Sequence, residues 1–108
     1  MPFNVVLTKA AARDVEELYD YIARHDTPEK AAHVLNKIEA VVAGLSTSPN
    51  RGAFPKELLE LGIREYREIF FKPYRVLYRI VDTRVCVLLV VDDRRDMQSL
   101  LHRRLFED

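Results

Sequence analysis

The chain has 108 residues, of which 48% are hydrophobic and 31% charged, a composition typical of a single globular domain and not of a disordered protein. It has 17 lysines and arginines and 17 aspartates and glutamates, and this zero net charge argues against broad nucleic-acid binding. The single cysteine, Cys86, excludes an internal disulfide bond and fits a reducing environment. Residues 1–4 show no signal-peptide pattern, and the apolar run at 85–91 is too short to span a membrane. We therefore expect a cytoplasmic protein.

The first half of the sequence predicts a short strand followed by two helices. Residues 3–7 have high β-propensity, and Thr8 can then cap a helix. Thr27, Pro28 and Glu29 form a strong signal for the start of a second helix. Because only a short turn separates the two, we expect an antiparallel helix hairpin. On the helical period, the side chains expected to be buried are Val15, Leu18, Ile22, Val34, Leu35, Ile38, Val42 and Leu45, and those expected to face water are Arg13, Asp14, Glu17 and Asp20.

Residues 63–91 predict three strands, separated by Lys72-Pro73 and by the turn at 82–84. The short turns favour an antiparallel meander. Residues 74–81 alternate, so we expect one face of this strand to carry Tyr74, Val76, Tyr78 and Ile80 and the other to carry Arg75, Leu77, Arg79 and Val81. Residues 85–91 are apolar at every position, which indicates a strand covered on both faces or lying within the sheet.

The remaining segments complete a single domain over residues 1–108. Residues 46–55 are rich in turn-forming residues, and residues 56–61 can add a helical turn. Residues 95–106 predict a short amphipathic helix, whose apolar side carries Met97, Leu100, Leu101 and Leu105. The order β-α-α-β-β-β-α predicts an α+β fold, in which the helix hairpin packs on a small, mostly antiparallel sheet that is followed by a short C-terminal helix.

Few residues in the sequence are arranged for common catalytic or cofactor chemistry. The glycines form no phosphate-binding loop, and the histidines are scattered over separate predicted elements, so we expect neither a metal nor a cofactor. Asp92 and Asp93 fit solvent-facing turn residues.

The arginines of the predicted sheet are the strongest candidates for a functional site. They are Arg64, Arg67, Arg75 and Arg79 within its predicted strands and Arg94 just past the last one. A guanidinium group can grip a phosphate or a carboxylate with its planar fork. Equally, these cations can be cross-strand partners of Glu65, Glu68, Asp82 or Asp92. The residues alone leave both interpretations open.

Several segments together resemble the RelE/ParE superfamily of bacterial toxins. They are the helix pattern at 11–22, the loop from Leu45 to Gly52, the segments 62–67 and 74–78, and Arg94-Arg95-Asp96 followed by a leucine-rich helix with Arg103 and Arg104. The resemblance implies a toxin of a type II toxin–antitoxin, or plasmid-stabilisation, system. It also implies an antitoxin, encoded by an adjacent gene, that wraps and neutralises the toxin.

The superfamily has two branches, ribosome-dependent mRNA endonucleases (RelE-like) and inhibitors of DNA gyrase that are not nucleases (ParE-like). The positions that resemble the RelE-like cationic set are Arg67, Arg75 and Arg94. The acid/base tyrosine of those enzymes falls at or near Leu100, and a His-Tyr pair found in some relatives falls near Asp92-Asp93, so neither acid/base candidate is present.

The resemblance is therefore closer to the ParE-like branch, and it implies a gyrase inhibitor without catalytic residues. The candidates for target contact are Arg94, Arg95, Arg103 and Arg104. The alternatives are a RelE-like endonuclease, acting on ribosomes and mRNA with substituted acid/base residues, and a homologue that binds partners without being toxic.

Overall fold

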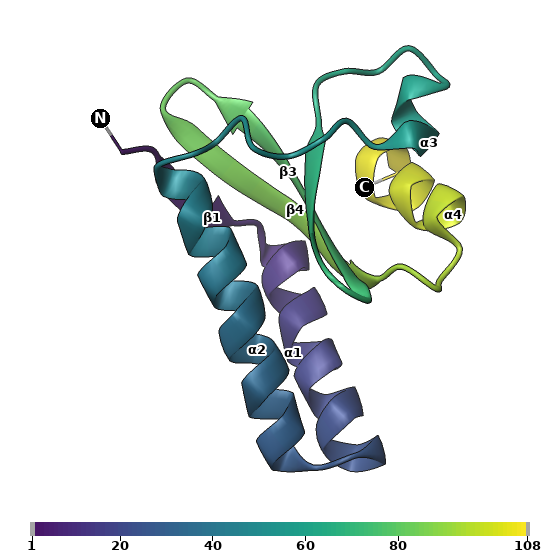
Figure 1. Cartoon of the computed structure of the whole chain (residues 1–108). Coiled ribbons are helices and arrows are strands. Elements are labelled where there is room, and N and C mark those ends of the chain that lie inside the picture. Colours follow the sequence, from purple (N-terminus) through teal and green to yellow (C-terminus); the bar gives the residue numbers. More distant parts are fainter. Residues whose placement is uncertain (1, 108) are drawn as a thin grey trace.

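A computed structural model describes residues 2–107 of the chain and shows the predicted α+β fold (Figure 1). Its elements in chain order are β1 (Asn4–Leu7), α1 (Lys9–His25), α2 (Pro28–Ala43), the 3₁₀ turn η1 (Gly44–Ser46), α3 (Lys56–Leu59), β2 (Arg67–Phe71), β3 (Tyr74–Val81), β4 (Arg84–Asp92), α4 (Met97–His102) and the π-helical turn η2 (Arg103–Glu107). None of the helices within residues 2–107 is both long enough and apolar enough to cross a membrane.

Both long helices begin where the sequence predicts. The backbone N–H of Ala11 donates to Thr8 Oγ1 at 3.0 Å, and that of Lys30 donates to Thr27 Oγ1 at 3.0 Å. Each cap satisfies a backbone donor that has no partner within its helix, a contribution of typically about 1 kcal/mol. Pro28 occupies the first turn of α2, where its missing N–H costs nothing.

The strands lie in the order β1-β4-β3-β2, which confirms a mostly antiparallel sheet. Strands β2, β3 and β4 form the predicted antiparallel meander, and β1 pairs with β4 in parallel. The apolar strand β4 therefore lies inside the sheet, as its composition indicates. The prediction of a strand from residue 63 was wrong, because β2 begins only at Arg67. The preceding apolar side chains, Ile63 and Tyr66, pack against a core cluster instead of extending a strand.

Two clusters of buried side chains occupy the two faces of the sheet. Tyr74, Val76 and Tyr78 of β3 join the cluster under the helix hairpin, which confirms the predicted alternation. Leu77 joins the second cluster with Leu58 of α3 and with Met97 and Leu101 of α4.

A β-bulge in β4 keeps both of its faces apolar. Leu77 pairs with Leu89 and Tyr78 pairs with Val87, so Leu88 is the extra residue. The alternation of β4 changes phase there. Val85, Val87 and Val90 accordingly contact one cluster while Leu89 and Val91 contact the other.

Helices α1 and α2 form the predicted antiparallel hairpin against one face of the sheet, and their connecting end extends well past it (Figure 1). Ile22, Val34, Ile38 and Leu45 are buried, and Val15, Leu18 and Val42 pack against them, as predicted. The expectation for Leu35 was wrong, because this side chain is only partly buried and is not one of those packed in the cluster. It lies about 100° around the helix from Val34, at the flank of the stripe that runs through Val34 and Ile38.

A buried tyrosine joins the sheet to the loop after the hairpin. The Tyr78 side chain is completely buried, its hydroxyl donates to the Pro49 carbonyl at 2.6 Å, and it accepts from the Gly52 N–H at 3.0 Å. A Cβ at position 52 would lie 2.6 Å from this hydroxyl, so only glycine allows the backbone this close.

We expect Tyr78→Phe to lower the free energy of unfolding by about 1–3 kcal/mol, because two buried backbone groups lose their partner. Urea denaturation at neutral pH measures the loss. Tyr74→Phe is the matched control, since the hydroxyl of this buried tyrosine has no hydrogen-bond partner within residues 2–107. Equal stabilities for the two variants would contradict the prediction.

Candidate functional site

An open cleft of about 680 Å³ lies on the face of the sheet that is not covered by the helix hairpin. Helix α3 and the start of α4 border it, and both lie on this side of the sheet in Figure 1. Its floor contains Glu68 and Phe70 of β2 and Arg75 of β3, which adjacent strands bring together. It is large enough to hold a small ligand or part of a partner.

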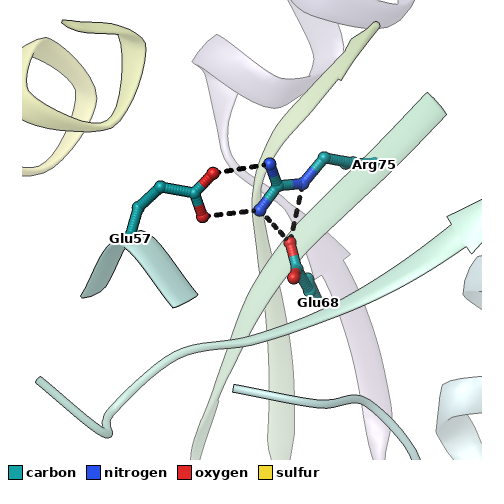
Figure 2. A network of polar contacts seen from close by, with 3 residues as sticks. All are labelled: Glu57, Glu68 and Arg75. Carbon is teal, nitrogen blue, oxygen red and sulfur yellow. Dashed lines mark hydrogen bonds and ion pairs between the residues drawn. The ribbon is translucent and has the colours of Figure 1, made fainter. Parts of the chain in front are cut away.

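Arg75 lies between two carboxylates in this cleft (Figure 2). Its Nη1 and Nη2 atoms donate to the two oxygens of Glu57 at 2.9 Å each, and its Nε donates to Glu68 Oε1 at 2.7 Å. Nη2 contacts the same oxygen of Glu68. All three nitrogen atoms of the guanidinium therefore donate to carboxylates, which leaves little capacity for gripping a phosphate.

Burial and pairing act differently on the two carboxylates. The hydrogen bonds from Arg75 hold the pKa of Glu57 below its ordinary value, whereas burial raises the pKa of Glu68. Pairing with both raises the pKa of Arg75, so it stays charged. When all three groups are ionised the network has a net charge of −1, and its field opposes the approach of an anion.

Arg67 leaves the sheet on the face opposite to Arg75. Residues that pair across two strands point to the same face, and Arg75 pairs with Phe70 of β2. Arg67 lies three positions before Phe70 on that strand, so the alternation of side chains turns it to the other face. The Arg67 Nη1 atom donates to the Gly52 carbonyl at 2.8 Å and the Asn50 carbonyl at 3.3 Å. Its guanidinium also lies 4.5 Å from the centre of the Phe54 ring. It therefore holds the loop against the edge strand.

Arg94 lies in a third place, beyond the end of β4. Its Nε donates to Asp92 Oδ1 at 2.9 Å, and 76% of its side chain is exposed. This pairing lowers the pKa of Asp92. Neither Arg94 nor Arg67 lines the cleft that contains Arg75. The structure thus does not bring the three predicted cations together.

The other candidates for target contact differ in whether their side chains are exposed or engaged in contacts within the protein. Arg95 and Arg103 are exposed. Arg104 instead donates to both oxygens of Asp14 at 2.9 Å and to the Leu88 carbonyl, which the β-bulge leaves available, at 2.7 Å. Asp14 also accepts from the Val90 N–H at 3.0 Å, so the prediction that it faces water was wrong. No local pattern signals this pair, because 90 residues separate its members.

Leu100 and the buried tyrosines of β3 are poorly suited to act as a general acid or base. Leu100 packs against the apolar cluster. Burial raises the pKa of Tyr74 and of Tyr78, which keeps both hydroxyls protonated at neutral pH. Within residues 2–107, no group of three or more His, Cys, Asp or Glu side chains is placed to hold a metal ion.

Residues 5–97 match the family model described as the ParE toxin of the type II toxin–antitoxin system, parDE. The chain is 27% identical over 101 residues to Toxin ParE3 of Caulobacter vibrioides, an alignment that covers 94% of this chain and 97% of that protein.

Two solved structures have similar folds. One, described as the chromosomal ParDE system of P. aeruginosa, superposes with a TM-score of 0.70 at 21% identity and covers 83% of this chain and 95% of that one. The other, from the toxin–antitoxin complex RelBE2 of Mycobacterium tuberculosis, gives a TM-score of 0.58 at 29% identity over 85% of this chain and 99% of that one.

Proposed function

Because the chain belongs to the family of ParE toxins of type II toxin–antitoxin systems, we propose that it inhibits DNA gyrase without catalysis of its own and is neutralised by an antitoxin encoded beside it. The proposal of gyrase inhibition is supported by the likeness of the chain to the ParE-like branch and to a relative named Toxin ParE3. Because this target and this partner would both be met in the cytoplasm, we propose that location for the protein.

The separation of Arg67, Arg75 and Arg94 is the observation that carries this proposal. Cleavage of RNA by its 2′-hydroxyl needs cations gathered around the phosphate, together with a general base and a general acid. Here Arg67 and Arg75 point to opposite faces, and Arg75 is paired with two carboxylates. The charged residues that line the cleft around it are five acids and three bases, and this excess of negative charge suits a phosphate poorly.

The antitoxin partner is supported by the solved relatives and by exposed apolar side chains. The RelBE2 structure is a toxin–antitoxin complex. In this chain Tyr21 on the hairpin is 62% exposed and Phe70 on the edge strand β2 is 46% exposed. Exposed apolar groups frequently mark partner surfaces, and extended segments add readily to edge strands. We therefore place the antitoxin partly on the hairpin and partly along the sheet.

A ribosome-dependent mRNA endonuclease is the alternative, favoured by the likeness to the toxin–antitoxin complex RelBE2. Two assays on the purified protein separate the possibilities. We expect inhibition of DNA supercoiling by gyrase, relief of that inhibition by the antitoxin, and intact mRNA in a reconstituted translation reaction. Ribosome-dependent cleavage that is lost in Arg94→Ala, with gyrase unaffected, would overturn the proposal. A protein inactive in both assays that still binds the antitoxin would be a non-toxic homologue.

We expect Arg95→Ala and Arg103→Ala each to weaken inhibition of gyrase about 5- to 30-fold, because both side chains are exposed near α4 and arginines often dominate binding energy. Arg94 is a further candidate, whereas Arg104 would act by holding η2 in place. The concentration that halves supercoiling measures the effect. Arg13→Ala, an exposed arginine on α1 with no ion pair within residues 2–107, is the control. An equal change in Arg13→Ala would show a non-specific effect of charge.

A further inference from the structure

The cleft on the free face of the sheet has an excess of negative charge. Its acidic lining residues are Glu57, Glu60, Glu68, Asp93 and Asp96. Its basic ones are Lys56, Arg75 and Arg95. Arg75 is already occupied by two of the carboxylates. A cation entering the cleft would therefore find carboxylates that have no ion-pair partner within residues 2–107.

Glu68 provides an unfilled acceptor at the floor of this cleft. Only 9% of its side chain is exposed, and both hydrogen bonds from Arg75 go to the oxygen Oε1. The other oxygen, Oε2, accepts no hydrogen bond within residues 2–107. Among the described side chains, the only polar atom that is both fully buried and without a hydrogen bond is Nε of Arg79. Oε2 of Glu68 is therefore not fully buried, and it contacts solvent through the cleft. A buried carboxylate that is half satisfied favours a ligand that completes its bonding.

The cleft also offers an aromatic surface beside these oxygens. Phe70 is 46% exposed and lines the cleft, and the guanidinium of Arg75 lies 5.8 Å from the centre of its ring. A ring that is open to solvent on an edge strand can accept a second planar cation by stacking. Glu60 is exposed nearby and has no ion pair within residues 2–107.

We propose that this cleft binds an arginine side chain of the antitoxin, a proposal that rests on the antitoxin partnership proposed above. The guanidinium would donate to Glu68 Oε2 and to Glu60 and would stack on Phe70. Its planar fork fits this combination of carboxylate and ring better than the compact ammonium group of lysine. The cleft would thereby give the antitoxin a fixed register along the sheet.

The first test uses a defined probe. In an NMR titration of the full chain, we expect N-acetyl-arginine amide to shift the amide signals of Glu60, Glu68 and Phe70. Its neutral analogue of similar shape, N-acetyl-citrulline amide, should bind at least about 5-fold more weakly, because it carries no charge. Equal shifts with both compounds, or shifts confined to other surfaces, would overturn the proposal.

The second test measures the affinity of the antitoxin, the product of the adjacent reading frame, for variants of the full chain. We expect Glu60→Gln and Phe70→Leu each to weaken binding about 5- to 30-fold, and Glu60→Gln also to reduce its dependence on salt. Asp82→Asn, which removes an exposed carboxylate of the β3–β4 turn outside both the cleft and the hairpin, is the matched control and should bind as the parent does. Thermal melting verifies that each variant is folded.

The outcomes of this second test separate the two proposals. Unchanged antitoxin affinity in both cleft variants would overturn the arginine site and leave the partnership intact. Loss of gyrase inhibition with unchanged antitoxin affinity would overturn it too, because the cleft would then contact gyrase. If the parent chain bound no antitoxin, both the antitoxin partnership and the arginine site would be overturned. Inhibition of gyrase could still be measured separately.

Discussion

Replacing Arg75 with alanine is expected to lower the free energy of unfolding by about 3–5 kcal/mol, the typical cost of removing one member of a buried ion-pair network. The side chains of Glu57 and Glu68 are only 12% and 9% exposed, so the substitution leaves two buried carboxylates without a cation. Urea denaturation of the isolated protein at pH 7 measures the change.

Arg94→Ala is the matched control, because its ion pair is largely solvated. With 76% of the Arg94 side chain exposed, we expect a change of at most about 1 kcal/mol. A second comparison replaces Glu57, Glu68 and Arg75 together with apolar residues of similar volume, which is expected to be neutral or stabilising. A large loss in this triple variant, or a loss in Arg75→Ala no larger than in Arg94→Ala, would contradict this account of the network.

The cost of Arg75→Ala should depend on pH. In the parent protein the pKa of Glu57 lies below its ordinary value of 4.5, so its stabilising contribution is present above that pH and is lost as the pH falls through the folded-state value. The pKa of Glu68 lies above 4.5, so this group favours folding more as the pH falls through its folded-state value. In the Arg75→Ala variant, protonation of Glu57 and Glu68 removes the cost of burying two carboxylate charges without a cation. The difference in stability should therefore shrink as the pH is lowered from 7 to about 4.

This network also determines which variants can report on function. A loss of activity in Arg75→Ala would combine any chemical effect with a large loss of stability. Arg94→Ala avoids this difficulty, because Arg94 is exposed and, within residues 2–107, forms an ion pair only with Asp92, two positions away. The ribonuclease alternative is consequently better tested at Arg94 than at Arg75.

The features that the sequence predicted well depend on local patterns. Thr8 and Thr27 lie next to the helices that they cap. The alternation of residues 74–81 depends only on the geometry of a strand, and it correctly placed Arg75 and Tyr78 on different faces. The interpretation of an arginine as a partner of Glu68 also came from nearby residues, and it is confirmed for Arg75.

The features that the sequence missed depend on contacts between distant segments. Glu57 reaches Arg75 only because α3 folds over the same face of the sheet. Arg104 meets Asp14 across a β-bulge at Leu88, and no residue of the uniformly apolar run 85–91 marks that position. Whether the arginines share one face, as a cationic site requires, could therefore be decided only when the register of the strands was known.

Helix α2 allows a second comparison of prediction and structure, because the helical period predicts that Ile38 and Leu35 are both buried, but their surroundings differ. The Ile38 side chain is 2% exposed within the core cluster, whereas Leu35 is only partly buried and is not one of those packed in that cluster. Periodicity identifies the apolar side of a helix but not how far its partner extends. Ala31 and Val34 lie nearer to the connecting end of the hairpin than Leu35 and are nevertheless buried, so Leu35 is less covered because it lies at the flank of the apolar stripe.

We expect Ile38→Ala to lower the free energy of unfolding by about 2–5 kcal/mol, because it removes buried methyl and methylene groups and leaves a cavity. Leu35→Ala should cost less, about 1–2 kcal/mol, since this side chain is only partly buried and alanine favours the helix. The two substitutions differ little in chemistry, so the gap between them measures burial alone. Urea denaturation of both variants in the absence of antitoxin gives the values. A cost for Leu35→Ala equal to that of Ile38→Ala would mean that the hairpin packs more extensively than its position beside the sheet indicates.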